Sequence, residues 1–193
     1  IRVSHDGIRW FPEDDPIRYS AQMLDREFGG TSSLEIIIDT GRENGIHDPD
    51  FLARLEGTMR WTETLSVDTY PVHKAISIVD VVKETNKALN RDRPDAYVVP
   101  RDRALIAQEL LLFENSGTDD LKDFTDSLFQ TARVTVRTPW IDAMMYPDFV
   151  DQVERELPEH LGEGTDFELT GGATIFARLF KAVILSMTGS YLI

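Results

Sequence analysis

The sequence predicts an α/β fold of the α+β kind, in which two strand–helix–strand units are separated by further helices. Three features of the sequence support this: short apolar runs of strand length, longer runs with apolar residues at every third or fourth position, and a similarity between the two halves of the chain. With 193 residues, of which 41% are hydrophobic and 28% charged, the chain can form one large or two small packed domains.

The first unit is expected over residues 33–76. SLEIIIDTG (33–41) places apolar side chains on both faces of an extended run, which predicts a strand covered on both sides. Asp48 and Pro49 then supply an N-cap and a first-turn residue for an amphipathic helix. A second strand is expected near Val72 to Ile76, which completes the unit.

The second half of the chain repeats this order of elements. A shift of 98 residues places PDFLARLE (49–56) on PDFVDQVE (147–154) and Ile36 on Val134, so that helix and strand positions stay in phase. We interpret this agreement as a duplication. The alternative is that any strand and helix pair shares such patterning, because each needs a capped start and an apolar stripe.

The expected domain organisation follows from these units. Residues 1–76 form a first subdomain, 77–126 the intervening helices, 127–172 the second unit, and 173–193 a terminal apolar helix. One intervening helix, within 101–117, has almost no polar face. Such a helix is either buried, which we expect, or meets an apolar partner outside this chain.

Composition and residue spacing exclude several function classes. Acidic residues outnumber basic ones by 34 to 20, so the surface repels phosphate backbones and nucleic acid is not an expected partner. The four histidines lack metal-ligand spacing, no glycine-rich nucleotide loop is present, and there is no cysteine. Acidic pairs such as Asp119–Asp120 are expected to be solvated surface. We therefore expect no catalysis, no cofactor and no metal.

The final segment, IFARLFKAVILSMTGSYLI (175–193), has no charged residue after Lys181. The remaining twelve residues are fewer than the roughly 20 that cross a bilayer. We expect 173–193 to be the start of a truncated transmembrane helix, with the chain as a loop between two membrane spans. The alternative is a buried C-terminal helix of a globular domain.

Eight segments follow one another along the chain in a recognisable order. They are WFPEDDP, FGG, SLEIIIDTG, DPDFL, SIVDVVKETNKAL, RALIAQELLLFENSGTDDLKDFTD, ARVTVRT and TGG. This succession resembles the first extracytoplasmic loop of the resistance-nodulation-division (RND) transporters, in their MmpL-like or hydrophobe-exporter branch. The resemblance covers nearly the whole chain and lies in the order of the segments, since none is specific alone. It implies two duplicated β-α-β porter subdomains of ferredoxin-like type in the periplasmic part of an inner-membrane protein.

This resemblance implies a proton-driven transporter that moves hydrophobic lipids, such as sterols or hopanoids, toward the outer membrane. The implied partners are a lipid or amphiphile, a second homologous periplasmic loop, a periplasmic adaptor or lipid-binding protein, and the membrane through flanking helices. The family's proton-relay residues lie in membrane spans, so none is assigned here. The alternative is a docking domain of a drug-efflux pump that recruits a periplasmic adaptor.

Two apolar stretches are candidates for substrate binding, because methionine is adaptable and aromatic rings offer a large contact area. One is the loop TPWIDAMMYPDF (138–149), and the other is the apolar helix within 101–117. Ordinary core packing is the alternative for the loop. The candidate residues are Trp140, Met144, Met145, Tyr146, Leu105, Leu110, Leu111 and Phe113.

Overall fold

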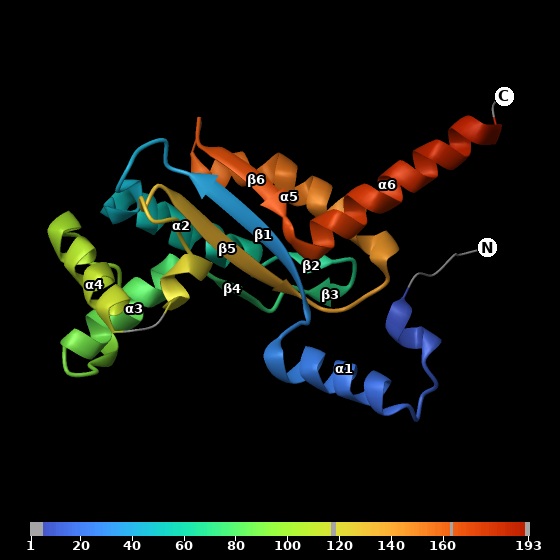
Figure 1. Cartoon of the computed structure of the whole chain (residues 1–193), viewed down its shortest axis with the longest axis horizontal. Helices are drawn as coiled ribbons and strands as arrows, with labels where there is room; N and C mark the ends of the chain where they lie inside the picture. The colour runs from blue at the N-terminus through green and yellow to red at the C-terminus, as the bar shows by residue number, and fades with distance from the viewer. Residues whose placement is uncertain (1–5, 117–118, 163, 192–193) are drawn as a thin grey trace.

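The computed structural model describes residues 6–116, 119–162 and 164–191, and it contains a mixed arrangement of helices and strands (Figure 1). The predicted α+β fold class is confirmed. Residues 1–5, 117–118, 163 and 192–193 of the expected segments lie outside the described ranges. The helices are η1 (Gly7–Trp10), α1 (Pro16–Phe28), η2 (Gly45–His47), α2 (Pro49–Thr62), α3 (Ile78–Leu89), η3 (Pro94–Ala96), α4 (Arg103–Asn115), η4 (Asp119–Asp123), η5 (Ala143–Met145), α5 (Tyr146–Leu161) and α6 (Gly171–Tyr191). The strands are β1 (Ser32–Asp39), β2 (Ser66–Val67), β3 (Tyr70–Pro71), β4 (Lys74–Ile76), β5 (Thr131–Thr138) and β6 (Asp166–Thr170).

Four strands form one sheet in the order β4-β5-β1-β6, and each neighbouring pair is antiparallel. Helix α2 connects β1 to β4, and helix α5 connects β5 to β6. Each connection therefore passes over a strand that belongs to the other unit. This is the β-α-β-β-α-β arrangement of ferredoxin-like domains.

The two units expected over 33–76 and 127–172 do not form separate sheets but interlock in one. Strand β5 lies between β1 and β4, and β1 lies between β5 and β6. Alternating apolar residues in the sequence identify strands but carry no information about which strands pair. The sequence pattern therefore left the mutual pairing of the two units open.

The structural repeat predicted from the 98-residue offset is visible in the register. Ile36 of β1 lies directly opposite Val134 of β5, and these are equivalent positions of the two units. An approximate two-fold axis therefore passes through this pair. The helices agree with it, because α2 begins at Pro49 and α5 has Pro147 in its first turn.

The units differ in the connection from helix to second strand. The first unit contains a short hairpin, β2–β3, between α2 and β4. In the second unit residues 162–165 connect α5 directly to β6. The hairpin was not expected from the sequence, because its strands have only two residues and are too short to show an alternating pattern.

The main core lies between the sheet and the pair α2–α5, which Figure 1 shows on the far side of the sheet. Both central strands present a fully buried apolar face toward these helices. The residues of that face are Leu34, Ile36, Ile38, Ala132, Val134 and Val136.

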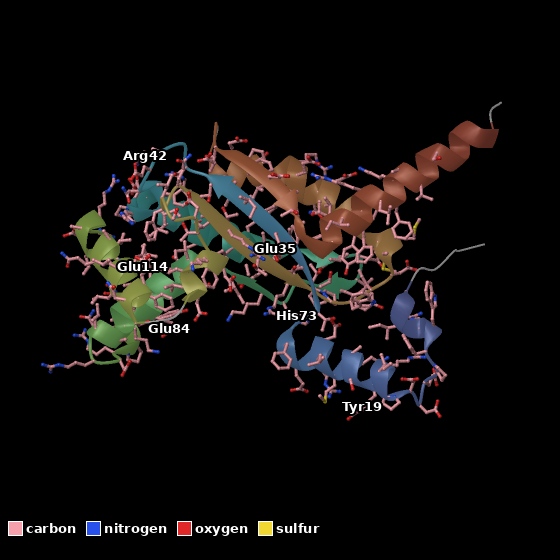
Figure 2. The ribbon with its side chains drawn as sticks, viewed as in Figure 1. Tyr19, Glu35, Arg42, His73, Glu84 and Glu114 are labelled. Carbon is pink, nitrogen blue, oxygen red and sulfur yellow. The ribbon has the colours of Figure 1, made fainter. Side chains whose placement is uncertain are left out.

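No helix of the described chain crosses the opposite side of the sheet, called here the open face (Figure 1). Glu35 lies on this side, as Figure 2 shows. The register places every second residue of each strand on the open face. These residues are Ser33, Glu35, Ile37, Asp39, Lys74, Ile76, Thr131, Arg133, Thr135, Arg137, Asp166, Glu168 and Thr170.

Helix α4 departs from the expected burial. Ile106 and Leu110 are buried, but Leu111 and Leu112 are 55% and 53% exposed. The packing face also includes Glu109, which is buried at 1% exposure. The main contacts of the helix are with α3, η2 and η4, and they leave Leu111 and Leu112 exposed.

Helix α6 begins directly after β6 and packs its first two turns against the body. Ala173 and Ala177 are buried, and Lys181 Nζ binds both carboxyl oxygens of Asp151 on α5 at 2.6 Å. Figure 1 shows the rest of α6 extending away from the body. Within the part of the chain that the structure describes, no helix combines the length and apolarity required to cross a membrane.

Candidate functional site

An apolar pocket of about 200 Å³ lies where η1, the loop before α5 and helix α6 meet. It forms at the end of the sheet where β5 finishes and β1 begins. Each of these three segments contributes aromatic or aliphatic side chains. The lining residues are Gly7, Trp10, Trp140, Ile141, Ala143, Tyr146, Phe176 and Phe180.

One wall of the pocket comes from α6. Phe176 and Phe180 are four positions apart, so they project from the same side of the helix. The Trp140 ring meets the Phe176 ring edge-on, with centroids 6.2 Å apart and an interplanar angle of 78°. This T-shaped geometry is the favoured one for aromatic pairs.

Hydrogen bonds fix the loop that carries the second wall. The backbone N–H of Trp140 donates to Oδ1 of Asp25 at 2.8 Å, and the Tyr146 hydroxyl donates to the Pro139 carbonyl at 2.9 Å. Burial raises the pKa of Tyr146, so its hydroxyl stays protonated at neutral pH. Because this hydroxyl already has a partner, the loop offers the pocket mainly hydrocarbon and aromatic surface.

Two of the four candidate residues of the loop line the pocket, and two do not. Trp140, 37% exposed, and Tyr146, 2% exposed, both line the pocket. Met144 is 38% exposed and Met145 is half-buried against the core, and neither lines the pocket. The single turn η5 directs these methionines away from it, which a linear sequence does not reveal.

The four candidates on α4 lie in a different part of the molecule. Leu110 is buried in the core and Phe113 packs against it, whereas Leu105 and Leu111 are exposed. Figure 1 shows α4 at one end of the molecule and α6 at the other. The loop and α4 therefore do not form one continuous site.

Sequence reasoning missed most of the pocket. Trp10 lies far from the loop in sequence, and the apolar run containing Phe176 and Phe180 was interpreted as the start of a membrane span or as a buried C-terminal helix, not as part of a binding site. The i, i+4 spacing of two phenylalanines beside buried alanines was the available signal.

An exposed aliphatic stripe lies on α6 beside the pocket. Ile175, Leu179 and Val183 are 61%, 53% and 43% exposed. Ile175 and Leu179 each precede a pocket phenylalanine by one position, which places them about 100° around the helix from it. The apolar surface of the pocket therefore continues outward along the helix.

A second, polar cleft of about 320 Å³ lies at the opposite end of the sheet. Arg42 and Arg54 line it together with Asp39, Asp48 and Asp166, and Arg42 binds Asp48 at 2.5 Å. Burial alone would raise the pKa of the Asp48 carboxyl, but hydrogen bonds from the Asp50 and Phe51 backbone N–H groups and the charge of Arg42 outweigh it, so the pKa is lowered. Among the described residues, no group of three or more potential ligands is arranged to hold a metal ion.

The apolar pocket is therefore the site with the most defined chemistry: a cleft lined mainly by aromatic and aliphatic surface. A scan against protein-family models and a search of curated proteins both find no match for this chain.

Proposed function

We propose that this chain binds the hydrophobic part of a lipid in the apolar pocket, as the periplasmic porter domain of a proton-driven inner-membrane RND transporter. The cargo is a sterol- or hopanoid-like lipid that moves toward the outer membrane. The pocket lining carries the proposal, because walls made mainly of aromatic and aliphatic side chains favour a hydrocarbon ligand. The resemblance of the segment order to RND loops supplies the transporter context.

The size of the pocket limits how much of the cargo it encloses. Its volume of about 200 Å³ is below the range of about 300–1,000 Å³ typical of pockets for drug-sized ligands. One end of a lipid therefore enters the pocket, and the rest lies on adjacent apolar surface. The aliphatic stripe of Ile175, Leu179 and Val183 offers that surface.

The test is binding of a fluorescent sterol to the 193-residue chain, compared among three proteins: wild type, Phe180→Ala and Leu111→Ala. Phe180 lines the pocket, whereas Leu111 is an exposed apolar residue on α4 and serves as the matched control. Loss of a buried aromatic contact is expected to weaken binding by about tenfold or more. Equal affinity of Phe180→Ala and wild type would contradict the proposal.

A second candidate function, docking of a periplasmic adaptor, is favoured by the exposed leucines of α4. Leu111 and Leu112 are adjacent and more than half exposed. Serine at both positions is expected to abolish cross-linking between the complete transporter and its adaptor, while sterol binding by the isolated chain is unchanged. Loss of sterol binding in this variant would count against separate roles for the two surfaces.

A further inference from the structure

The open face of the sheet carries charges of opposite sign at two diagonal corners. At one corner Lys74 of β4 lies directly opposite Arg137 of β5. At the other, Asp39 of β1 lies opposite Asp166 of β6, and Glu168 is nearby on the same strand and face. We call these the basic corner (Lys74, Arg137) and the acidic corner (Asp39, Asp166, Glu168).

Each corner is electrostatically unfavourable within the single chain. Like charges directly opposite one another across two strands are destabilising. Among the described residues, neither Lys74 nor Arg137 lies within ion-pair distance of an acidic side chain. In the same part of the chain, Asp166 and Glu168 have no basic partner at that distance. Each corner therefore gains free energy from charges supplied by a partner.

The centre of the open face is already neutralised. Arg133 donates from Nε to Oε2 of Glu35 at 2.9 Å, and the Thr135 hydroxyl donates to the same oxygen at 2.6 Å. Ile37 and Ile76 are half-buried beside them. The face thus has a nearly uncharged middle between two charged corners.

The corners are spaced for pairing between two identical faces. Arg137 lies opposite Ser33 and Asp166 opposite Asp39, so the corners are six residues apart along β1, or about 20 Å. A two-fold axis parallel to the sheet and perpendicular to this diagonal exchanges the corners. In such an isologous contact each basic corner meets the partner's acidic corner, and both contacts form at once.

We propose that the open face is a self-association surface, on which a second copy of this chain docks face to face with basic corner on acidic corner. This interaction goes beyond the proposed lipid function and uses none of the pocket residues.

The proposed dimer is weak. The strands of the sheet have eight, eight, five and three residues, and at about 3.3 Å per residue and about 4.8 Å between strands they give a face of about 400 Å². Stable interfaces bury about 800 Å² on each partner, so association in the micromolar range or weaker is expected. The formal net charge of −14 also opposes association at low ionic strength, where long-range repulsion is unscreened.

Charge reversal tests the geometry directly. Variant one, Lys74→Glu with Arg137→Glu, makes both corners acidic, and variant two, Asp166→Lys with Glu168→Lys, makes the second corner mainly basic. Each variant alone is expected to self-associate at least about tenfold more weakly than wild type in sedimentation equilibrium at 0.15 M salt. An equimolar mixture of the two is expected to form a heterodimer, because opposite charges then meet at both corners.

The double change Arg91→Glu with Arg101→Glu, at two exposed residues away from the open face, alters the total charge as much as variant one does and is expected to leave association unchanged. Circular dichroism of each variant checks the fold, and the mixture serves as an internal rescue. A wild-type chain that stays monomeric up to millimolar concentration would overturn the proposal. Equal self-association of wild type and variant one, or a mixture that stays monomeric, would overturn it as well.

Discussion

Glu35 and Arg133 occupy equivalent positions in the two strand–helix–strand units, 98 residues apart, and bind one another across the open face. The Arg133 side chain donates from Nε at 2.9 Å to a carboxylate that also accepts hydrogen bonds from Ser33 and Thr135. These contacts lie next to the Ile36–Val134 pair, through which the approximate two-fold axis passes. The two units therefore have a similar backbone but different charged side chains at this position, and the acid of one unit forms an ion pair with the base of the other.

Removal of this carboxylate is expected to weaken the contact between the units. Glu35 is buried, but the Arg133 side chain is 42% exposed and can be resolvated, so the cost is reduced. We expect Glu35→Ala to lower the free energy of unfolding by about 1–2 kcal/mol in urea titration. Glu168→Ala, an exposed acid on the same face, is expected to change it by less than about 0.5 kcal/mol. Similar losses for both variants would show that the Glu35 contacts have no specific role.

Two glycine substitutions are expected to have opposite effects on stability. Gly30 has a φ of +119°, and a Cβ there would lie 2.3 Å from the Thr138 carbonyl oxygen. Because that oxygen belongs to the backbone, Gly30→Ala is expected to cost more than about 2 kcal/mol. Gly57 lies exposed inside α2 with open space around it, so Gly57→Ala is expected to gain about 0.5–1 kcal/mol. Thermal melts distinguish the two, and a stable Gly30→Ala would contradict the close approach.

The carboxylate of Asp25 is expected to control the order of the pocket loop. Its Oδ1 accepts from the N–H and hydroxyl of Thr31 and from the N–H of Trp140, which joins the end of α1 to the loop. Asp25→Ala is expected to increase amide exchange at Trp140 and to cost about 1 kcal/mol. Asp25→Asn retains an acceptor oxygen and is expected to preserve most of the protection. Unchanged exchange in Asp25→Ala would show that ring packing alone fixes the loop.

The repeat is recognisable in the sequence, but the pairing of its strands is not. Helix caps and apolar spacing are local signals, so α2 and α5 were predicted close to their observed positions. Strand pairing is non-local, and nothing in β1 alone indicates that its partners are β5 and β6.

The candidate site was predicted in part for a similar reason. Trp140 and Tyr146 lie in one short loop and were found, whereas Trp10 and Phe180 join them only through the tertiary fold. The apolar composition of α4 predicted burial, yet Leu111 is exposed because none of the elements that the structure describes covers it. The apolar composition of a helix indicates that its side chains favour burial, but it does not identify the element that buries them.

The last prediction concerns Glu109, whose carboxyl group is buried on the packing face of α4. Neither of its oxygens has a hydrogen-bond partner among the described residues, and burial raises its pKa from 4.5 to about 7. In the unfolded chain the group ionises near 4.5, so the folded state retains the proton over a higher pH range. Stability is therefore greatest below pH 4.5 for this group and falls as the pH rises through about 7.

Glu109→Gln removes this titration while it preserves the size of the side chain. We expect the variant to be more stable than wild type by about 2–3 kcal/mol at pH 8, and the difference to shrink toward zero near pH 4.5. The pKa of His47 on η2, which contacts α4, is lowered by burial and by the charge of Arg103. Protonation of His47 therefore lowers the stability of the folded chain as the pH falls, which is opposite to the effect of Glu109. The effect of His47 is common to both proteins and cancels in the difference. Urea titrations between pH 5 and 8 provide the measurement, and a difference that does not change with pH would show that Glu109 ionises freely in the folded chain.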